Sequence, residues 1–512
     1  MTSSQTIPSW YKGKNIFITG GTGFVGICLI EKLLRVIPET GDIYLLMRPK
    51  KGKEISDRLE DIKKNLIFEK VLETRSPEQV FSKLKAIAGD VAQPNLGLSE
   101  ADRKILTEKI NVIFHSAATL DFAEGLRETV NVNLLGTRRV LELANQCRNL
   151  NAYIHVSSAY VNSYNLKAEE IIYPLKEDPE GVISLVEKMD DEKLEKMTPD
   201  LLGDHPNTYT FTKHMAEHEV KKSQTKFSCA IVRPSMIVGA WKEPIPGWTI
   251  SKNGPQGFLM GASKGVVRRL PVGKELVYDY IPVDIVVNTL IAAGFHAGST
   301  NAKEVEVYQC TSSTRNPFRW IAVDDKVNDY LHKYPLKSAV WYPHLKFLPS
   351  VTWFKISALF VHFLPAFILD TITRLVGGRP ILMRLHRNVN SSLDRLEKFI
   401  FTEWEFPAEK TDKLHNWLSS ADQQAFNLDI SSLVWPDYFD YLTQGARRYL
   451  SNEKMSNISS ARSKDTILRF LHFGLQVAIY ALIWYLVACI TGKSMKSASF
   501  IVPVAYILFS FL

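Results

Sequence analysis

The chain has few cysteines, and it lacks the signals of secreted, disulfide-bonded or zinc-binding proteins. Its five cysteines stand far apart, with no Cys-x-x-Cys pair and no spacing typical of metal ligands. This pattern argues against a disulfide framework and a zinc site, and it fits a reducing compartment. The first residues, MTSSQTIPSWYKGK, contain no hydrophobic segment of a signal peptide. We therefore expect no metal, and we expect most of the chain to stay in the cytosol.

The charge is only mildly unbalanced. Lys and Arg number 62 against 54 Asp and Glu, which leaves a net charge of +8 over 512 residues. We find no basic stripe interleaved with aromatic residues and no nucleic-acid-binding motif, so we expect no nucleic-acid partner. With 46% hydrophobic and 23% charged residues, the chain belongs among folded proteins. Its length exceeds one ordinary core, so at least two structural regions are expected.

Short β-branched runs alternate with helical patterns through the first half of the chain. Helical periodicity is clear at 24–36 and 128–147. Near-continuous apolar strands separated by helices indicate a parallel sheet covered on both faces, which is a doubly wound α/β (Rossmann) fold. The predicted strands are 15–19, 43–47, 112–115, 152–157 and 229–233.

A glycine-rich turn follows the first predicted strand and opens a helix. Gly20, Gly23 and Gly26 recur at three-residue intervals in NIFITGGTGFVGICLIEKLL. The first glycine permits a tight turn, the second lets a pyrophosphate approach the backbone, and the third lets helix and sheet pack closely. The helix N-terminus then offers N–H groups to the phosphates. This context predicts a dinucleotide site.

The residues after the second strand favour one form of the dinucleotide. An NAD-preferring site usually has an acid there that bonds the ribose 2′-hydroxyl, whereas this strand is followed by Arg48. A guanidinium can pair with a 2′-phosphate, so NADPH is expected. Asp90, at the end of KAIAGD, could face the adenine amino group, and Ala117 could line the dinucleotide.

Tyr209 and Lys213 form YTFTK in a predicted helix, where a separation of four places both side chains on one face. An ammonium beside a phenol favours the phenolate, so we expect Lys213 to lower the pKa of Tyr209. Ser158 closes the fifth strand at the carboxyl edge of the sheet, where its hydroxyl could hold a substrate carbonyl oxygen. These three residues are the predicted catalytic group.

The C-terminal part contains long apolar stretches. Residues 466–490 end in seventeen residues without charge, long enough to cross a bilayer as a helix. Residues 499–512 are expected to form a second partial span or an in-plane segment, and 351–369 an interfacial or buried helix. The polar stretch 451–463 is typical of a linker. We therefore expect the membrane to be a partner through the tail.

The motif set resembles the extended short-chain dehydrogenase/reductase superfamily. More narrowly, it is similar to the eukaryotic (insect-like) fatty acyl-CoA reductases of the male-sterility type. The matching segments are TGGTGFVG, YLLMRPK, FHSAATLDF, HVSSAYVN, YTFTK with the following HMAE, VRPSMIVG, IPVDIVVN and the region of WPDYFDYL.

The resemblance implies reduction of a long-chain fatty acyl-CoA to the primary alcohol with two NADPH, through an aldehyde and with release of CoA. Tyr209 would donate to the oxyanion, Ser158 would position it, and Lys213 would also hold the nicotinamide ribose. Thr22, Phe24 and Pro234, in the matching motifs, are expected to add cofactor contacts.

The implied organisation has four parts. Residues 1–345 form the reductase domain, 346–450 a helical C-terminal domain, 451–465 a linker and 466–512 a membrane-anchoring tail. The tail would insert in the endoplasmic reticulum or peroxisome and leave the catalytic domain in the cytosol.

Two other functions stay open at this point. One is a membrane-associated sterol or sugar-nucleotide dehydrogenase of the same superfamily, which would not need a helical domain after residue 350. The other is a scaffold that senses NADP without catalysis. Such proteins typically lose the tyrosine or the lysine, and this chain retains both.

Overall fold

The computed structural model describes residues 5–50, 52–223 and 227–511, which form two compact units that interleave along the chain. Unit 1 comprises Met1–Thr249, Val277–Phe318 and Glu403–Val434, and unit 2 comprises the rest. Residues 403–434 therefore lie with the N-terminal part, whereas the sequence suggested one domain over 346–450. The division into four parts stays a prediction. Residues 1–4 and 512, at the two ends of the chain, lie outside the described ranges.

Unit 1 is built on a seven-stranded parallel sheet in the order β11-β6-β5-β4-β1-β2-β3. The strands are β1 (Asn15–Thr19), β2 (Ile43–Met47), β3 (Leu84–Ala88), β4 (Ile110–His115), β5 (Ala152–Val156), β6 (Ser228–Pro234) and β11 (Glu306–Cys310). The register pairs Phe17 of β1 with Tyr44 of β2 and with Ile113 of β4. The direction of strand order reverses between β1 and β4, which is where ligands bind in such sheets.

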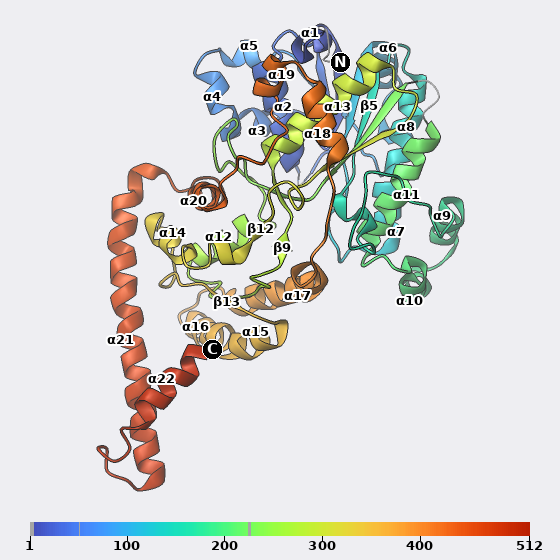
Figure 1. Cartoon of the computed structure of the whole chain (residues 1–512). Helices are drawn as coiled ribbons and strands as arrows, with labels where there is room; N and C mark the ends of the chain where they lie inside the picture. The colour runs from blue at the N-terminus through green and yellow to red at the C-terminus, as the bar shows by residue number, and fades with distance from the viewer. Residues whose placement is uncertain (1–4, 51, 224–226, 512) are drawn as a thin grey trace. The chain divides into compact units, whose positions relative to one another are not determined.

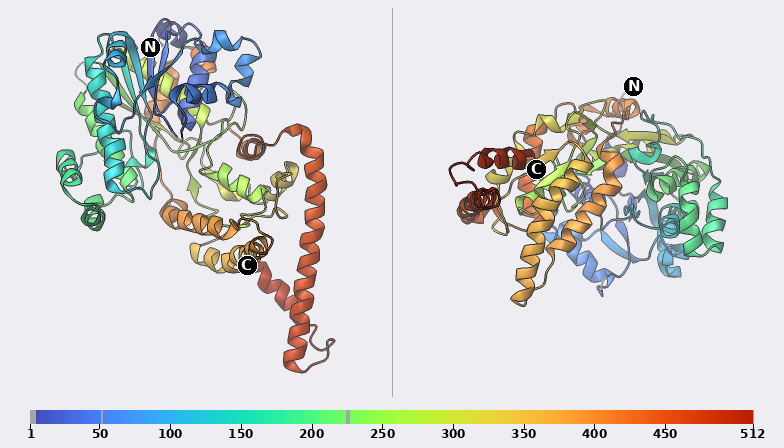
Figure 2. Two further views of the ribbon diagram at one scale, coloured as in Figure 1. Left: turned by 180° about the vertical axis from the view of Figure 1, so that it is seen from behind. Right: turned by 90° about the horizontal axis from the view of Figure 1, so that it is seen from below.

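Helices cover both faces of this sheet (Figures 1 and 2). On one face, α2 (Phe24–Val36) packs against α13 (Val283–Thr300), which also contacts β5 and β6. On the other face, α8 (Gly136–Gln146) packs against α6 (Glu100–Lys109) and α11 (Thr208–Ser223). The doubly wound α/β prediction is confirmed.

Two of the seven strands, β3 and β11, were not among the predicted runs. β3 lies at the edge of the sheet, and of its residues LKAIA only Leu84 and Ile87 are buried. β11 begins with Glu306 and includes Gln309. Neither shows the continuous apolar run that marks a central parallel strand. The predicted helix 128–147 is also interrupted, because a π-helical stretch at Val130–Leu135 precedes α8.

The segment after β7 (Met236–Val238) is held by a buried carboxylate. Asp284, in the first turn of α13, accepts hydrogen bonds from the backbone N–H groups of Trp241, Lys242 and Glu243 at 2.8–3.0 Å. Burial raises the pKa of Asp284, although these N–H groups act in the opposite direction. The segment ends at Trp248, whose side chain is fully buried.

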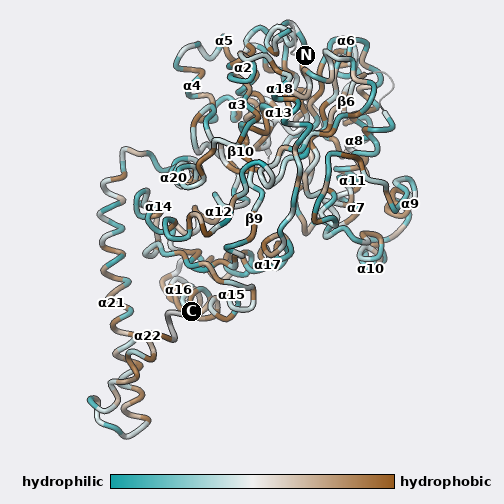
Figure 3. Tube along the Cα trace, in the orientation of Figure 1, coloured by the Kyte–Doolittle hydropathy of each residue, from teal (hydrophilic) through white to brown (hydrophobic). Residues whose placement is uncertain are grey.

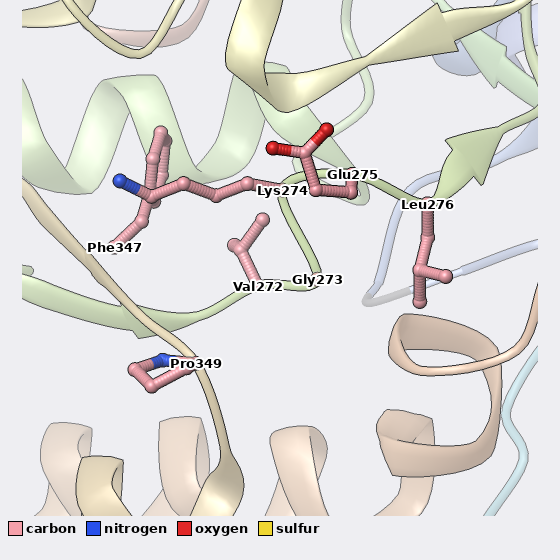
Figure 4. Close-up of a pocket in the computed structure, with 7 residues that line it drawn as sticks. All are labelled: Val272, Gly273, Lys274, Glu275, Leu276, Phe347 and Pro349. Atoms are coloured by element: carbon pink, nitrogen blue, oxygen red, sulfur yellow. The ribbon is translucent and has the colours of Figure 1, made fainter.

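Unit 2 contains a short parallel ladder of β8 (Arg269–Pro271) with β13 (Lys346–Leu348). Helices α12 (Pro255–Ser263), α14 (Val327–Lys333) and α20 (Trp435–Gly445) pack on one another in the same unit. Next to the ladder lies a cavity of about 420 Å³ (Figure 4). It is lined by Val272, Gly273, Lys274, Glu275, Leu276, Phe347 and Pro349.

The remaining helices of unit 2 include long apolar segments (Figure 3). They are α15 (Val351–Ala358), α16 (Leu364–Leu375), α17 (Leu382–Ile400), α21 (Ile458–Thr491) and α22 (Ile501–Phe511). Within the described residues, two helical segments are long and apolar enough to cross a membrane, Val351–Leu375 and Met455–Thr491. The second begins inside the stretch expected as a linker, where Glu453 accepts hydrogen bonds from the N–H groups of Lys337 and Ser338.

Replacing Asp284 with alanine leaves three backbone N–H groups without their acceptor. We expect the free energy of unfolding to fall by about 3 kcal/mol, because buried unsatisfied donors each cost about 1–3 kcal/mol. Thermal unfolding of the detergent-solubilised protein, followed by tryptophan fluorescence, measures the change. Asp284→Asn, which keeps one acceptor oxygen, is the control and should lose less. Equal melting of Asp284→Ala and the unmodified protein would contradict this account.

Candidate active site

The residues predicted to bind the dinucleotide gather at the carboxyl edge of the unit 1 sheet. Each follows or ends a different strand: the glycine turn after β1, Arg48 after β2, Asp90 after β3, Ala117 after β4 and Pro234 at the end of β6. Because the strands are parallel, their carboxyl ends share one edge. The site residues, first named from motifs, thus come from one continuous region of the fold.

The glycine turn has the close approaches that its sequence predicts. Gly20 has φ of +73°, and a Cβ there would lie 2.8 Å from the backbone nitrogen of Ala117. A Cβ on Gly26 would lie 2.3 Å from the carbonyl oxygen of Gly20. Gly23 is the N-cap of α2, and no side chain caps that end. The turn therefore offers open backbone N–H groups at a helix N-terminus, which fits a dinucleotide pyrophosphate.

Phe24, the first residue of α2, supports the turn from outside. Its ring stacks on Trp248 with centroids 5.5 Å apart. The indole Nε1 of Trp248 donates to Asn65 at 3.3 Å. The segment that Asp284 holds therefore ends against the glycine turn, so the two parts of unit 1 are coupled through one aromatic contact.

The two residues expected at the adenosine end pair with each other. Arg48 Nη1 donates to Asp90 Oδ2 at 2.9 Å, in a pair that is exposed on the Arg48 side. Arg58, which the sequence reasoning missed, donates to the Arg48 carbonyl oxygen and, at 3.2 Å, to the Thr22 hydroxyl. The Arg58 guanidinium therefore links the backbone of Arg48 to the glycine turn. The sequence did contain a signal for Arg58, because this arginine lies one turn into the helix that follows the basic turn after β2.

The structure brings Ser158, Tyr209 and Lys213 together. Asn207 caps α11 by accepting from the Thr210 N–H at 2.9 Å, which sets the start of the helix that carries Tyr209 and Lys213. The phenol of Tyr209 is hydrogen-bonded to the Ser158 hydroxyl. Lys213 Nζ donates to the carbonyl oxygen of Val156, at the end of β5, at 2.7 Å.

The predicted lowering of the Tyr209 pKa is wrong for this structure. Burial raises the pKa of Tyr209 to about 12, and the hydrogen bond with Ser158 opposes that only in part. Burial also lowers the pKa of Lys213 to about 8, against the charge of Glu217. The ammonium is directed to the Val156 carbonyl, so desolvation of the phenol prevails. The Tyr209 phenol is therefore neutral near pH 7.

A buried ion pair lies one turn beyond Lys213, and the sequence reasoning missed it. Both Glu217 oxygens accept from Arg233 of β6, at 2.8 and 2.6 Å, and Ser157 Oγ donates to Glu217 at 2.6 Å. Arg233 also donates to the carbonyl oxygens of Glu169 and Ile171. Burial would raise the pKa of Glu217, but the Arg233 charge and these hydrogen bonds lower it overall. The signal was available as the four-residue spacing Tyr209–Lys213–Glu217.

Asn133 is a second missed residue. It lies in the π-helical stretch, fully buried, where such distortions often mark functional positions. Its side chain accepts from the Thr119 N–H at 3.0 Å and donates to Thr212 Oγ1 at 3.2 Å. It thus ties the loop after β4 to the helix that carries Tyr209 and Lys213.

Residues from the distant segment 403–434 complete this side of unit 1. Tyr160, two residues after Ser158, makes edge contacts with Trp404 and Phe406 at 5.5 and 5.2 Å between ring centroids. Trp404 Nε1 donates to the Ser163 carbonyl oxygen at 3.0 Å. These aromatic residues stand more than 240 positions from Tyr160 in sequence, so no local pattern could have placed them here.

Replacing Glu217 with glutamine leaves the buried Arg233 charge unpaired. We expect the free energy of unfolding to fall by about 3–5 kcal/mol, since breaking a buried pair strands the remaining charge. Because the folded pKa of Glu217 lies below its ordinary value, the pair stabilises the protein above about pH 4.5, and this stabilisation is lost as pH falls further. Thermal unfolding measured across pH tests both statements. Glu180→Gln, in an exposed pair with Arg138, is the control and should change stability little. A Glu217→Gln variant as stable as the control would contradict the role of the pair.

Comparison with known proteins finds matches along most of the chain. Two family models, both described as "Male sterility protein", match residues 18–290 and 361–453. A Drosophila melanogaster protein named among the fatty acyl-CoA reductases is 52% identical over 516 residues, covering 100% of both chains. Fatty acyl-CoA reductase 1 of Rattus norvegicus is 36% identical, and that of Homo sapiens 35%, each over 98% of this chain and 97% of the relative.

Among solved structures, the reductase domain of a nonribosomal peptide synthetase from Mycobacterium tuberculosis has a TM-score of 0.58 at 18% identity. It covers 88% of this chain and 94% of its own. The terminal R domain from the myxalamid pathway has a TM-score of 0.56 at 18% identity, covering 85% and 91%. These two likenesses support the fold. The full-length relatives do not favour a sterol or sugar-nucleotide dehydrogenase. The chain is an oxidoreductase that uses a nicotinamide cofactor, and it belongs to the fatty acyl-CoA reductase family.

Proposed function

We propose that this protein reduces long-chain fatty acyl-CoA to the primary fatty alcohol with NADPH. One thioester, two NADPH and two protons would give one alcohol, one CoA thiol and two NADP⁺, with an aldehyde between the two reductions. The observation that carries the proposal is that Ser158 hydrogen-bonds the Tyr209 phenol while Lys213, one turn along the same helix, bonds the carbonyl oxygen of Val156. The relatives' names supply the substrate class.

The bound cofactor supplies the hydride that reaches the carbonyl carbon. Tyr209 donates its proton to the oxygen on which negative charge develops, and Ser158 holds that oxygen beside the phenol. A reduction needs a donor that is protonated before hydride transfer, and a phenol with a pKa of about 12 meets that need. Lys213, on the same helix face, would hold the nicotinamide ribose when the cofactor is bound. Gly20, Thr22, Gly23, Phe24, Gly26, Ala117 and Pro234 form the cofactor cradle.

The proposed preference for NADPH over NADH is supported by Arg48 and Arg58. The Arg58 guanidinium bonds the Thr22 hydroxyl, and the nearby acid, Asp90, is paired with Arg48. A 2′-phosphate carries the charge and the acceptor oxygens to take the place of Asp90 on Arg48. An NADH ribose offers only a hydroxyl there. Both arginines would therefore discriminate through the phosphate.

The proposed location is a membrane, with the Met455–Thr491 helix as anchor. Residues 474–490 carry no charge, and their large apolar side chains are mostly exposed, as in Leu482 and Ile490. A charge-free helix of this length approaches the thickness of a bilayer core. We place the anchor in the endoplasmic reticulum or peroxisome, with units 1 and 2 on the cytosolic side.

Replacing Tyr209 with phenylalanine removes the proton donor. With palmitoyl-CoA and NADPH, we expect hexadecanol formation by the detergent-solubilised protein to fall by about 100- to 10,000-fold, while NADPH binding stays unchanged. Extracted lipid and cofactor oxidation are measured together, and about two NADPH should be consumed per alcohol.

Tyr308→Phe is the matched control, since it removes another buried hydroxyl, one that bonds His296. Retained activity in Tyr209→Phe would contradict the assigned donor. Aldehyde as the only product would contradict the second reduction.

Replacing Arg48 or Arg58 with glutamine tests the cofactor preference. We expect KM for NADPH to rise about ten-fold or more, because a hydrogen bond to a charged group contributes about 1.5–3 kcal/mol. KM for NADH should hardly change, since no phosphate is lost as a partner. Arg103→Gln, on α6 and bonded to Gln146, is the control. Equal effects on both cofactors would contradict readout of the 2′-phosphate.

A further inference from the structure

The helical segment Val351–Leu375 exposes a broad apolar face. It runs through α15, a π-helical turn (Leu359–Phe363) and α16. Phe367 is 60% exposed and Leu375 81% exposed. The face includes Trp353, Leu359, Leu364, Phe367, Ile372 and Leu375. A patch of this kind in water marks a surface that binds something apolar.

Only a narrow stripe of the segment packs into unit 2. The buried residues recur every three or four positions, as on one side of a helix. They are Val351, Phe354, Ser357, Ala358, His362, Ala366 and Asp370. This stripe contacts β8 and α17. The other sides of the segment are exposed and available to a partner. A helix buried in a protein core would be covered on all sides.

The segment cannot cross a bilayer, despite its length. β13, just before it, pairs with β8 of the same unit, and residues 403–434, after it, belong to unit 1. No other described segment between 277 and 402 is long and apolar enough to cross. The chain before residue 349 and the chain after residue 402 therefore lie on the same side of the bilayer. If Val351–Leu375 crossed the bilayer, the chain would have to cross back before residue 403. A return crossing would fall on α17, which carries six charged side chains, so there is none.

Positive charge follows the apolar face directly. Arg374, Arg379, Arg384 and Arg387 are all exposed. Asp370 is the one acidic residue between 369 and 390. It turns inward and accepts from the backbone N–H groups of 381–383, at the start of α17. Apolar side chains flanked by arginines match the acyl chains and anionic headgroups of a lipid surface.

One residue connects this face to the proposed anchor. The backbone N–H of Arg268 donates to His362 Nε2 at 3.0 Å, in the middle of the segment. The guanidinium of Arg268 lies 3.3 Å from His472 Nε2 of α21. His472 directly precedes the charge-free stretch of α21. Arg268 therefore holds the buried side of this segment close to the start of the proposed anchor, so that both can lie at one bilayer surface.

We propose that Val351–Leu375 lies in the plane of a lipid bilayer as a second membrane contact. Its apolar side chains would enter the acyl-chain boundary, and the four arginines would bind anionic headgroups. The proposal rests on the proposed membrane location, but not on the proposed reaction. Its effect is to hold unit 2 against the membrane instead of leaving it tethered by one helix.

Depth-dependent fluorescence quenching in nanodiscs tests the proposal with the full chain. In a Cys147→Ser, Cys489→Ser background, Phe367→Cys carries an environment-sensitive NBD label. Lipids with a spin label high or low on the acyl chain act as quenchers. Leu482→Cys, in the anchor, and Leu166→Cys, 64% exposed in unit 1, are the matched controls.

We expect blue-shifted emission from the Phe367 probe, quenched more by the shallow label than by the deep one. The Leu482 probe should respond more to the deep label, and the Leu166 probe to neither. A Phe367 probe that behaves like Leu166 would overturn the proposal, and stronger deep quenching would indicate a span and also overturn it. A blue shift without quenching would mean that protein covers this face, again against the proposal. If only the Leu482 probe is not quenched by the deep label, the proposed anchor is contradicted. The Phe367 result would still test the in-plane contact by itself.

The arginines have their own arm of the experiment. Quenching of the Phe367 probe should increase when phosphatidylserine is added to phosphatidylcholine. That increase should disappear when Arg379, Arg384 and Arg387 are replaced together by glutamine. The control replaces Lys188, Lys193 and Lys196 in unit 1, and it should keep the increase. If phosphatidylserine does not increase quenching in the protein with its arginines unmodified, the headgroup contact is overturned.

Discussion

The buried ion pair between Glu217 and Arg233 is the interaction on which the candidate site depends. It joins α11, the helix of Tyr209 and Lys213, to β6, and through Ser157 it reaches the end of β5. A fully buried pair is stable only with its hydrogen bonds complete, and here Arg233 also satisfies two backbone carbonyls. The helix therefore has one register relative to the sheet. That register sets where the phenol meets the Ser158 hydroxyl.

Much of the fold follows from local sequence. Asn15–Thr19, Ile43–Met47 and Phe24–Val36 have the predicted bounds, because continuous apolar strands and a glycine-opened helix depend on neighbouring residues alone. β3 and β11 were missed because edge strands tolerate polar residues, such as Lys85 and Gln309. The Tyr160 contacts with Trp404 and Phe406 depend on chain topology, which periodicity does not encode.

The electrostatics of the site were harder to predict than its members. Spacing placed Lys213 beside Tyr209, but the direction of the phenol pKa depends on burial, which only the packed structure defines. Arg48 was named for a phosphate, and in the structure it holds Asp90. Such an exposed pair contributes little stability. In the proposed NADPH complex, a phosphate would therefore replace the carboxylate at little cost, and Asp90 would hold the arginine nearby beforehand.

The return of residues 403–434 to unit 1 has a consequence for the order in which the chain is made. Trp404 and Phe406 are synthesised long after the seven strands, so the wall beside Tyr160 is added to a sheet whose other parts already exist. Domains fold as units while the chain emerges, N-terminal parts first. The last segment of unit 1 ends at Val434, forty residues before the charge-free stretch begins at Gly474. Every residue of unit 1 is therefore translated before the charge-free stretch that we propose as the anchor.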